Sequence, residues 1–364
     1  MKAVAEEVVP LTNRKIRSII GSPEKCALAV NLIYVRDNDE GIRRMRRGKQ
    51  FFYLDRGANV VKDKVVVARI NSLGIPPAWE NVWICSLDNG HLQATGYDAM
   101  QRKQYLYHSL WHSLRTQTKF YRLLQFGQVI PGIRTRVEKD LALLGLPVEK
   151  VLALVVSLME LTNMRVGNSM YEKLYGSYGM TTLKDQHVQI SGSQLKFSFR
   201  GKKGVYHDIS IKNKRLAKLV QACRDIPGKE LFQYFTPEGD RKSIDSGMVN
   251  AYIKEITGEE FTAKDFRTWS GTILAFLALK EIGSFEKATE AKKKIVEVLD
   301  IVSQHLGNTR NVCKKYYVHP VLLSMYENKA LEKYFPVVHK DRTNNNAMIL
   351  SPDEQTVLKI LEAN

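Results

Sequence analysis

The sequence predicts an α+β protein, in which a small β-rich domain precedes a mostly α-helical domain that carries an inserted β-hairpin. Three patterns support this fold class. Short apolar runs separated by Gly, Pro, Asn and Asp fill residues 34–107, as is typical of strands joined by turns. From Ser109 onward the apolar residues recur at helical spacing. Residues 188–209 then return to near alternation around a glycine-flanked pair of lysines, which indicates a hairpin.

The first third of the chain is predicted to contain a leader and the β-rich domain. Residues 1–33 are expected to form a leader with one short helix, and residues 34–108 the β-rich domain. Its candidate strands are residues 51–54, 65–67 and 82–85. Clear turn signals separate these strands at residues 55–57, 74–77 and 88–90.

The remaining residues, 109–364, are predicted to form a mostly helical domain with one interruption. A mixed apolar face runs from Leu110 to Phe126 and begins the helical pattern. The inserted strands are expected at residues 188–190, 195–200 and 205–209, with Lys202 in the turn before the last strand.

The charge balance points to a polyanionic partner. The chain has 364 residues, with 55 Lys and Arg against 38 Asp and Glu, which gives a net charge of +17. Nucleic acid is the simplest such partner, because cationic side chains release its condensed counterions. A basic protein from a basic proteome is the alternative that charge alone leaves open.

Cysteine usage and hydropathy predict a soluble protein of the cytoplasm, or of the nucleus if the source is eukaryotic. The four cysteines are far apart and form no CxxC pair, as expected for reduced intracellular thiols and not for a disulfide framework or a zinc site. No apolar run approaches the ~20 residues that span a bilayer. The first residues lack the apolar core of a signal peptide.

Two basic regions in the first 140 residues could face nucleic acid. No acidic residue occurs between Asp98 and Glu138, and this interval also holds Gln104, Tyr105 and Tyr107. Amides can read base edges and cations can hold phosphates, although the tyrosines could equally be ordinary sheet residues. The basic residues of the interval are Arg102, Lys103, Arg115, Lys119, Arg122, Arg134 and Arg136. A second cluster, interpreted as a phosphate clamp or a solvated face, is Arg43, Arg44, Arg46, Arg47 and Lys49.

Four later residues have a chemical and a structural interpretation each. Arg165 and Arg267 present forks that suit phosphate oxygens, but could serve a helix end or an ordinary salt bridge. Lys202 could be a mobile general acid or simply an exposed turn residue. Tyr317 could be a nucleophile or a core aromatic residue. Their joint order along the chain favours the chemical interpretation.

With these residues in place, the chain resembles a type IB DNA topoisomerase of the compact bacterial and poxvirus-like kind. The resemblance extends from about residue 34 to residue 326. It implies a β-rich domain and a mostly helical catalytic domain, shared with tyrosine recombinases, that close as a clamp on duplex DNA. The motifs that carry it are RKQYLY at 102–107, RVGNSMY at 165–171, FRGKKGVYH at 199–207, TAKDFRTW at 262–269 and LGNTRNVCKKYY at 306–317.

The resemblance implies a role for each catalytic candidate. Tyr317 matches the nucleophile that forms a 3′-phosphotyrosyl link, with Tyr316 as its neighbouring rival. Arg165 and Arg267 match the arginines that hold the non-bridging oxygens. Lys202 matches the general acid for the leaving 5′ oxygen, with Lys203 as the alternative.

The remaining positions carry over less directly. Asn308 stands where poxviral and nuclear members have histidine, so a neutral amide replaces a side chain that can become charged. Lys264 matches a supporting basic residue in contact with DNA. The other positions assigned to DNA contact are Arg102, Lys103, Gln104, Tyr105, Tyr107 and Tyr171.

The expected activity is relaxation of supercoiled double-stranded DNA by nicking, rotation and religation. The resemblance implies no cofactor, no metal ion and no ATP, and we expect a monomer in the cytoplasm, associated with the nucleoid. No GxxxxGK[ST] phosphate-binding loop occurs. Two alternatives remain: a tyrosine recombinase or integrase, which usually carries HxxR where this chain has Lys264 to Arg267, and a non-catalytic DNA-binding protein.

Overall fold

The computed structural model describes residues 11–48, 50–335 and 348–364, so Lys49 and the first part of the predicted leader lie outside the described residues. The chain divides into two compact units, Met1–Arg122 and Leu123–Asn364, here called unit 1 and unit 2. The division falls inside the long helix α4 (Ser109–Leu141). None of the helices in the described ranges is long and apolar enough to cross a membrane.

Unit 1 contains an antiparallel sheet in the order β2-β1-β3-β4-β5. The core of the sheet packs against Ile70 of helix α3 (Lys64–Ser72). The other buried residues of this core are Ile42, Tyr53, Val82, Ile84 and Ala94. The strands are β1 (Gly41–Arg47), β2 (Gln50–Leu54), β3 (Glu80–Cys85), β4 (Leu92–Tyr97) and β5 (Lys103–Tyr107).

The predicted strand at residues 65–67 is wrong, because these residues begin α3. The carboxylate of Asp63 accepts hydrogen bonds from the main-chain N–H groups of Val65 and Val66 and so caps the helix. The run of β-branched valines favours a strand by propensity, but the cap and the burial of Ile70 one turn later outweigh that preference.

The part of the predicted leader that is described holds two helices and not one. These are α1 (Asn13–Ile19) and α2 (Pro23–Leu28), capped by the hydroxyl groups of Thr12 and Ser22. Both contribute to a buried cluster with Trp111 at the start of α4. The segment is therefore an integral part of unit 1.

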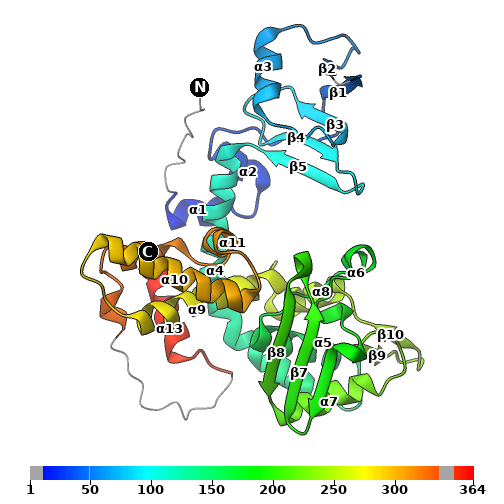
Figure 1. Cartoon of the computed structure of the whole chain (residues 1–364), viewed down its shortest axis with the longest axis vertical. Coiled ribbons are helices and arrows are strands. Elements are labelled where there is room, and N and C mark those ends of the chain that lie inside the picture. Colours follow the sequence, from blue (N-terminus) through cyan, green and yellow to red (C-terminus); the bar gives the residue numbers. More distant parts are fainter. Residues whose placement is uncertain (1–10, 49, 336–347) are drawn as a thin grey trace. The chain divides into compact units, whose positions relative to one another are not determined.

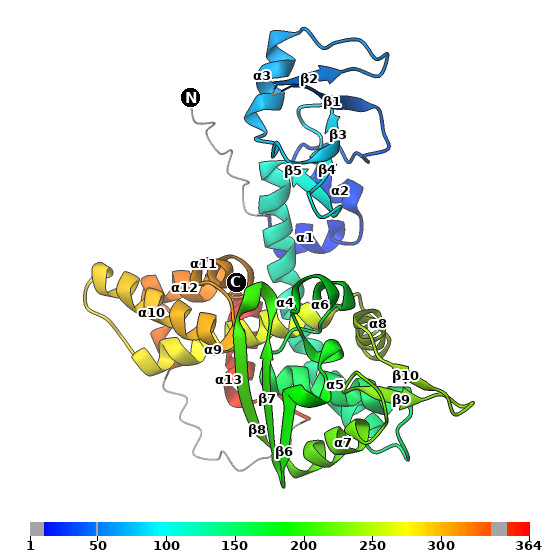
Figure 2. The ribbon, with the colours of Figure 1, turned by 45° about the vertical axis from the view of Figure 1, so that its right-hand side comes forward.

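Unit 2 is mostly helical and carries two small sheets. The predicted hairpin is the β7–β8 part of a three-stranded antiparallel sheet in the order β6-β7-β8, which packs against α5 and α7 (Figure 1 and Figure 2). The strands are β6 (Val188–Ser191), β7 (Gln194–Arg200), β8 (Tyr206–Lys212), β9 (Gln233–Phe235) and β10 (Arg241–Ser243). The helices are α5 (Val148–Thr162), α6 (Ser169–Tyr175), α7 (Lys214–Arg224), α8 (Ser246–Thr257), α9 (Ala263–Ile282), α10 (Ala288–Leu306), α11 (Arg310–Tyr316), α12 (Pro320–Glu327) and α13 (Pro352–Ala363).

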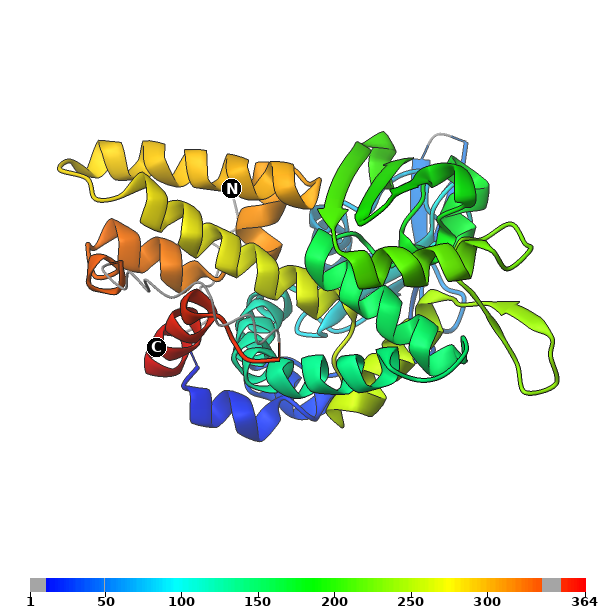
Figure 3. The same ribbon diagram turned by 90° about the horizontal axis from the view of Figure 1, so that it is seen from below.

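Helix α9 lies at the centre of unit 2. It contacts α5, α8, α10, α12 and α13, and Figure 3 shows α9 and α10 in yellow and orange, running side by side. The ring of Trp269 packs against Gly127 of α4, where an added Cβ would lie 2.5 Å from the ring. This close approach needs a glycine, and it fixes the first turns of α9 in the core.

A buried ionic network ties α13 to α4 and α9. Arg134 donates hydrogen bonds to both carboxylate oxygens of Glu354 at 2.7 and 3.1 Å, and to Glu160 at 2.7 Å. Trp269 Nε1 donates to the same Glu354 carboxylate at 3.2 Å. Because charges in such a place are costly when unpaired, we expect this network, which includes Glu160 of α5, to hold the four helices in register.

Candidate active site

Arg165 and Arg267 approach one turn of the chain from two sides. Arg165 lies in the connection between α5 and α6, and Arg267 in the first turns of α9. The turn, residues 306–309, joins α10 to α11 and is called the 306–309 turn below. Its Gly307 has φ +58, a left-handed conformation that ends α10 at low cost only with glycine.

Hydrogen bonds fix both guanidinium groups to this turn. Arg165 Nη2 donates to the carbonyl oxygen of Gly307 at 3.0 Å and to Asn308 Oδ1 at 2.6 Å. Arg267 Nη2 donates to the carbonyl oxygen of Leu306 at 2.7 Å, and its Nη1 donates to that of Asn163. The ordinary salt bridge considered for Arg267 is therefore replaced by bonds to main-chain carbonyls.

The two positive charges are held close together without a neutralising carboxylate among the described residues. Burial, and after it the charge of Arg267, together lower the pKa of Arg165 to about 10. Burial also lowers the pKa of Arg267, whose side chain is only 4% exposed. Such an arrangement is costly in the empty site and favourable when an anion enters it.

Donors remain available to that anion. Both bonds of Arg165 start from Nη2, so its Nε and Nη1 take no part in them. Nε of Arg267 is buried and has no hydrogen-bond partner within the described ranges. A buried donor without an acceptor costs about 1–3 kcal/mol, and an anion oxygen that accepted from it would relieve this cost.

Tyr317 lies beside Arg267, directly after α11. The guanidinium carbon of Arg267 is 5.3 Å from the centre of the Tyr317 ring. The Thr272 hydroxyl donates to the carbonyl oxygen of Tyr317 at 3.2 Å, and a Cβ added to Gly271 would lie only 2.7 Å from that oxygen. Helix α9 therefore anchors the Tyr317 main chain closely.

Tyr316 has different surroundings. Its side chain is 39% exposed and its ring lies 5.4 Å from the ammonium group of Lys315. The structure thus brings Tyr317, Arg165, Arg267 and Asn308 together, and the core interpretation of Tyr317 fits poorly with its half-buried ring.

The predicted lysines lie on exposed positions. Lys202 begins a short turn, η3 (Lys202–Gly204), between β7 and β8, and its side chain is exposed. Lys264 is exposed in the first turn of α9, one helical turn before Arg267.

A residue that the sequence analysis did not select, His207, contacts both the 201–204 turn and the 306–309 turn. Its presence in the FRGKKGVYH motif was the available signal.

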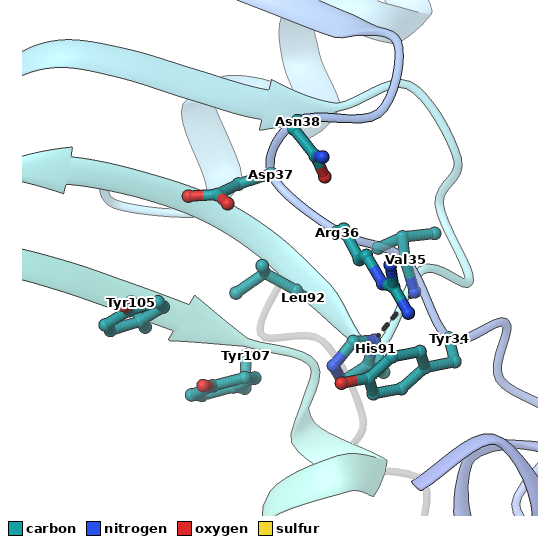
Figure 4. A pocket seen from close by; sticks show the side chains of 9 residues that line it. All are labelled: Tyr34, Val35, Arg36, Asp37, Asn38, His91, Leu92, Tyr105 and Tyr107. Carbon is teal, nitrogen blue, oxygen red and sulfur yellow. Dashed lines mark hydrogen bonds between the residues drawn. The ribbon is translucent and has the colours of Figure 1, made fainter.

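Tyr105 and Tyr107 of β5, which are predicted to face DNA, line an open pocket of about 540 Å³ in unit 1. Figure 4 shows their rings lying parallel, with centres 6.1 Å apart. At the other end of the pocket the Tyr34 and His91 rings are stacked at 4.3 Å, and His91 Nδ1 accepts a hydrogen bond from Val35 (Figure 4). The lining residues are Tyr34, Val35, Arg36, Asp37, Asn38, His91, Leu92, Tyr105 and Tyr107.

The other predicted contacts beside this pocket have protein partners. Arg102 pairs with Asp98 at 2.6 Å, and the Gln104 amide donates to the same carboxylate at 2.9 Å. Lys103 pairs with Asp37 at 2.5 Å. In unit 2, Tyr171 of α6 is 42% exposed and stacks on Tyr175.

Several cations of the two basic regions have structural roles, contrary to a uniform DNA-facing surface. Arg134 belongs to the buried network described above, and Arg136 pairs with Asp140 and Glu255. In β1, the Arg44 guanidinium donates to main-chain carbonyls at residues 75, 76 and 79 and lies 4.3 Å from the centre of the Phe51 ring. Arg43 and Arg47 are exposed.

No group of three or more His, Cys, Asp or Glu side chains in the described ranges is placed to hold a metal ion. The four cysteines are buried and unpaired with one another.

Comparison with known families gives two matches along the chain. The model described as "Eukaryotic DNA topoisomerase I, catalytic core" matches residues 108–340, and "Bacterial DNA topoisomerase IB, N-terminal domain" matches residues 50–98. The DNA topoisomerase 1B of Acanthamoeba polyphaga mimivirus is 33% identical over 301 residues, covering 79% of this chain and 88% of the viral protein. The DNA topoisomerase 1B of Vaccinia virus (strain Copenhagen) is 25% identical over 254 residues, covering 69% of this chain and 77% of the vaccinia protein.

Proposed function

This chain belongs to the type IB DNA topoisomerases, and we propose that it relaxes supercoiled duplex DNA through a transient 3′-phosphotyrosyl link, without ATP or a metal ion. The observation that supports this chemistry best is the pair of guanidinium groups, Arg165 and Arg267, held on the 306–309 turn beside Tyr317. Two clustered cations without a carboxylate form a site for a phosphodiester.

The proposed first step exchanges one phosphoester bond for another. The Tyr317 oxygen attacks the scissile phosphorus, and its proton passes to solvent. The bond between the phosphorus and the 5′ oxygen breaks, and Lys202 donates a proton to this leaving oxygen, which becomes a 5′-hydroxyl. Religation is the reverse reaction. Because the phosphotyrosyl bond conserves the energy of the broken bond, no nucleotide is consumed.

Arg165 and Arg267 stabilise the charge that develops on the non-bridging oxygens. Donors fixed in advance for such oxygens are each worth about 10²–10³ in rate. Asn308 Oδ1 accepts from Arg165 Nη2 and so orients the guanidinium, while the amide adds no charge of its own. Tyr317 Oη, and not Tyr316 Oη, is the proposed nucleophile because only its ring lies against Arg267.

Binding of the duplex is assigned to both units. In unit 1, Gln104, Tyr105 and Tyr107 offer an amide and two ring faces along β5. Lys264 and Tyr171 are exposed on unit 2. Arg102 and Lys103, which pair with Asp98 and Asp37 in the structure, are assigned to phosphate contact. We propose that the protein acts as a monomer on DNA of the cytoplasm.

The test is relaxation of supercoiled plasmid in EDTA without ATP. We expect relaxed circles from the wild-type protein and none from Tyr317→Phe. A 5′-labelled strand should become covalently attached to the denatured protein, whereas a 3′-labelled strand should be released with a 5′-hydroxyl that a polynucleotide kinase can phosphorylate. Folded protein that neither relaxes plasmid nor forms this adduct would contradict the proposal. Adducts that require synapsis of specific sites would instead favour recombinase chemistry.

A further inference from the structure

We propose that His207 is a positioning residue, whose ring sets the turn carrying Lys202 against the turn that holds Arg165 and Asn308. The inference rests on the proposed function, because it assigns a means of aligning the general acid of that reaction. His207 itself does not touch the reacting atoms in this proposal; it acts through the two turns that it separates.

The ring of His207 occupies space that two glycines leave open. A Cβ added to Gly201 would lie 2.6 Å from His207 Cδ2, and one added to Gly307 would lie 2.5 Å from His207 Cε1. Real Cβ atoms do not approach other atoms so closely. The imidazole is therefore in contact with the main chain of both turns, which are distant in the sequence.

On the hairpin side, His207 contacts Gly201, which directly precedes Lys202. Gly201 N donates to the carbonyl oxygen of Val205 at 2.7 Å, which closes the turn that contains Lys202. His207 pairs in register with Phe199 of β7, and the two rings stack at 5.1 Å with an interplanar angle of 22°. The stack fixes the plane of the imidazole and, through it, the position of Gly201.

On its other side, the ring contacts the 306–309 turn, which belongs to the proposed phosphate site. Gly307, which His207 contacts, accepts the hydrogen bond from Arg165 Nη2 at 3.0 Å. Burial lowers the pKa of His207 below its ordinary value of 6.5, and the charges of Arg165 and Arg267 lower it further. The ring is thus neutral at neutral pH and adds no third cation, which is consistent with a spacing role.

A small change in this spacing has a large chemical effect. Lys202 is exposed and flexible, so its ammonium group reaches the leaving oxygen only if its turn is held at the correct distance from the phosphate. A misplacement of about 1 Å can reduce a reaction about 10²-fold. Removal of the imidazole should therefore affect DNA cleavage as loss of Lys202 does, and less as loss of Arg165 or Arg267 does.

A change of the leaving atom distinguishes a defect of the general acid from a defect of the arginines. A duplex oligonucleotide with sulfur in place of the bridging 5′ oxygen releases a thiolate, which needs no proton donor, whereas the oxygen version does. We expect His207→Ala to cleave the oxygen substrate about 10²-fold more slowly than wild type and the sulfur substrate within about fivefold. Lys202→Ala is the reference for this pattern, and Arg267→Gln should lose cleavage of both substrates.

The matched control is Tyr206→Ala on the same strand, because the Tyr206 side chain is 67% exposed. It should leave both cleavage rates unchanged. Equal losses of His207→Ala on the two substrates, or no loss on the oxygen substrate, would overturn the inference. If the wild-type protein cleaves neither substrate, the proposed function fails and the inference fails with it.

A second pair of variants guards against simple misfolding. Gly201 has a negative φ, −91, so Gly201→Ala strains no backbone and only pushes a methyl group into the imidazole. Gly201→Ala should slow cleavage of the oxygen substrate. The double variant Gly201→Ala/His207→Ala should be no slower than His207→Ala alone, because the added methyl group then meets no imidazole. Additive losses in the double variant, with wild-type thermal unfolding, would contradict the contact as the cause.

Discussion

Arg165 and Arg267 donate hydrogen bonds to two consecutive carbonyl groups of the same turn. Their separate origins, a loop after α5 and the start of α9, converge because α10 ends at a left-handed glycine. The arrangement sacrifices stability for function, since two guanidinium groups are partly desolvated beside each other.

Arg165→Gln should leave the protein at least as stable as wild type while reducing DNA cleavage about 10²-fold or more. The pKa of Arg165 in the fold, about 10, lies below its ordinary value, so charged Arg165 destabilises the fold by up to a few kcal/mol. That penalty is constant below pH 10 and is relieved as pH rises from about 10 to 12.5, so the stability gap between variant and wild type should narrow there. Thermal unfolding and a cleavage assay measure both effects.

Arg310→Gln is the control for this variant. Arg310 pairs with Asp300 at 2.7 Å on the surface, where an ion pair contributes little to stability. Its cleavage rate should match wild type. A marked loss of stability in Arg165→Gln would show that its hydrogen bonds outweigh the repulsion.

Asn308→Asp should increase thermal stability and abolish most cleavage. The new carboxylate would accept from Arg165 at the present position of Asn308 Oδ1 and neutralise the charge that the phosphate needs. Asn308→His keeps a hydrogen-bonding side chain without a fixed negative charge and should retain cleavage within about tenfold. Single-turnover cleavage of a labelled duplex distinguishes the two, and an active Asn308→Asp enzyme would place the phosphate elsewhere.

Tyr317→Phe should form no covalent adduct while binding duplex DNA with wild-type affinity. Tyr316→Phe should keep adduct formation within about threefold, because the Tyr316 ring is more exposed and lies beside Lys315. Gel analysis after denaturation detects the adduct. The opposite result for the two variants would make Tyr316 the nucleophile.

Glu354→Gln should reduce the free energy of unfolding by about 2 kcal/mol, because Arg134 then keeps only Glu160 as a charged partner. Burial alone raises the pKa of Glu354, but hydrogen bonds from Arg134 outweigh it and hold that pKa below 4.5. The stability contributed by Glu354 is therefore present above pH 4.5 and lost as pH falls through the lowered value.

Asp353→Asn, in the same turn of α13, tests whether any lost charge would have this effect. Asp353 pairs with the half-buried Lys280 at 3.0 Å, and its removal should cost less than about 1 kcal/mol. Chemical denaturation at pH 7 and pH 4 compares the three proteins. Equal losses for the two variants would contradict a special role of the buried network.

Asp37→Asn should strengthen binding of duplex DNA at low salt. Lys103 now pairs with Asp37 beside Tyr105 and Tyr107, so removal of the carboxylate leaves a full positive charge for phosphate. The slope of log affinity against log salt should steepen by about 1. Fluorescence anisotropy in a Tyr317→Phe background measures it, and Glu24→Gln, which changes net charge equally on α2, should have a smaller effect.

Local patterns in the sequence were sufficient for the parts of the site that lie within one motif. The spacing from Asn308 to Tyr317 and the KxxR pattern ending at Arg267 both depend on neighbours a few residues away. In the structure Asn308 accepts a hydrogen bond from Arg165 and the Tyr317 ring lies beside Arg267, while the chemical roles of these residues stay predictions. The β7–β8 strands were predicted for the same reason, since alternation is a local property.

One error was local, and the other two arose where residues distant in the sequence decide. The run of valines at 65–67 favours a strand, but Asp63 and the core position of Ile70 make it helical. The acid-free interval suggested free cations, yet Arg134 finds its carboxylate at Glu354, far along the chain. His207 was overlooked because its importance lies in Gly201 and Gly307, and contact between these turns is visible only in three dimensions.

The network around Glu354 also constrains the order of events during biosynthesis. Arg134 and Trp269 are made long before Glu354, so a nascent chain lacks the carboxylate that both of them contact. Folding proceeds from the N-terminus as the chain emerges. The start of α9, and with it Arg267, should therefore reach its final rigidity only after α13 has left the ribosome, which would delay DNA nicking until synthesis of this helix is complete.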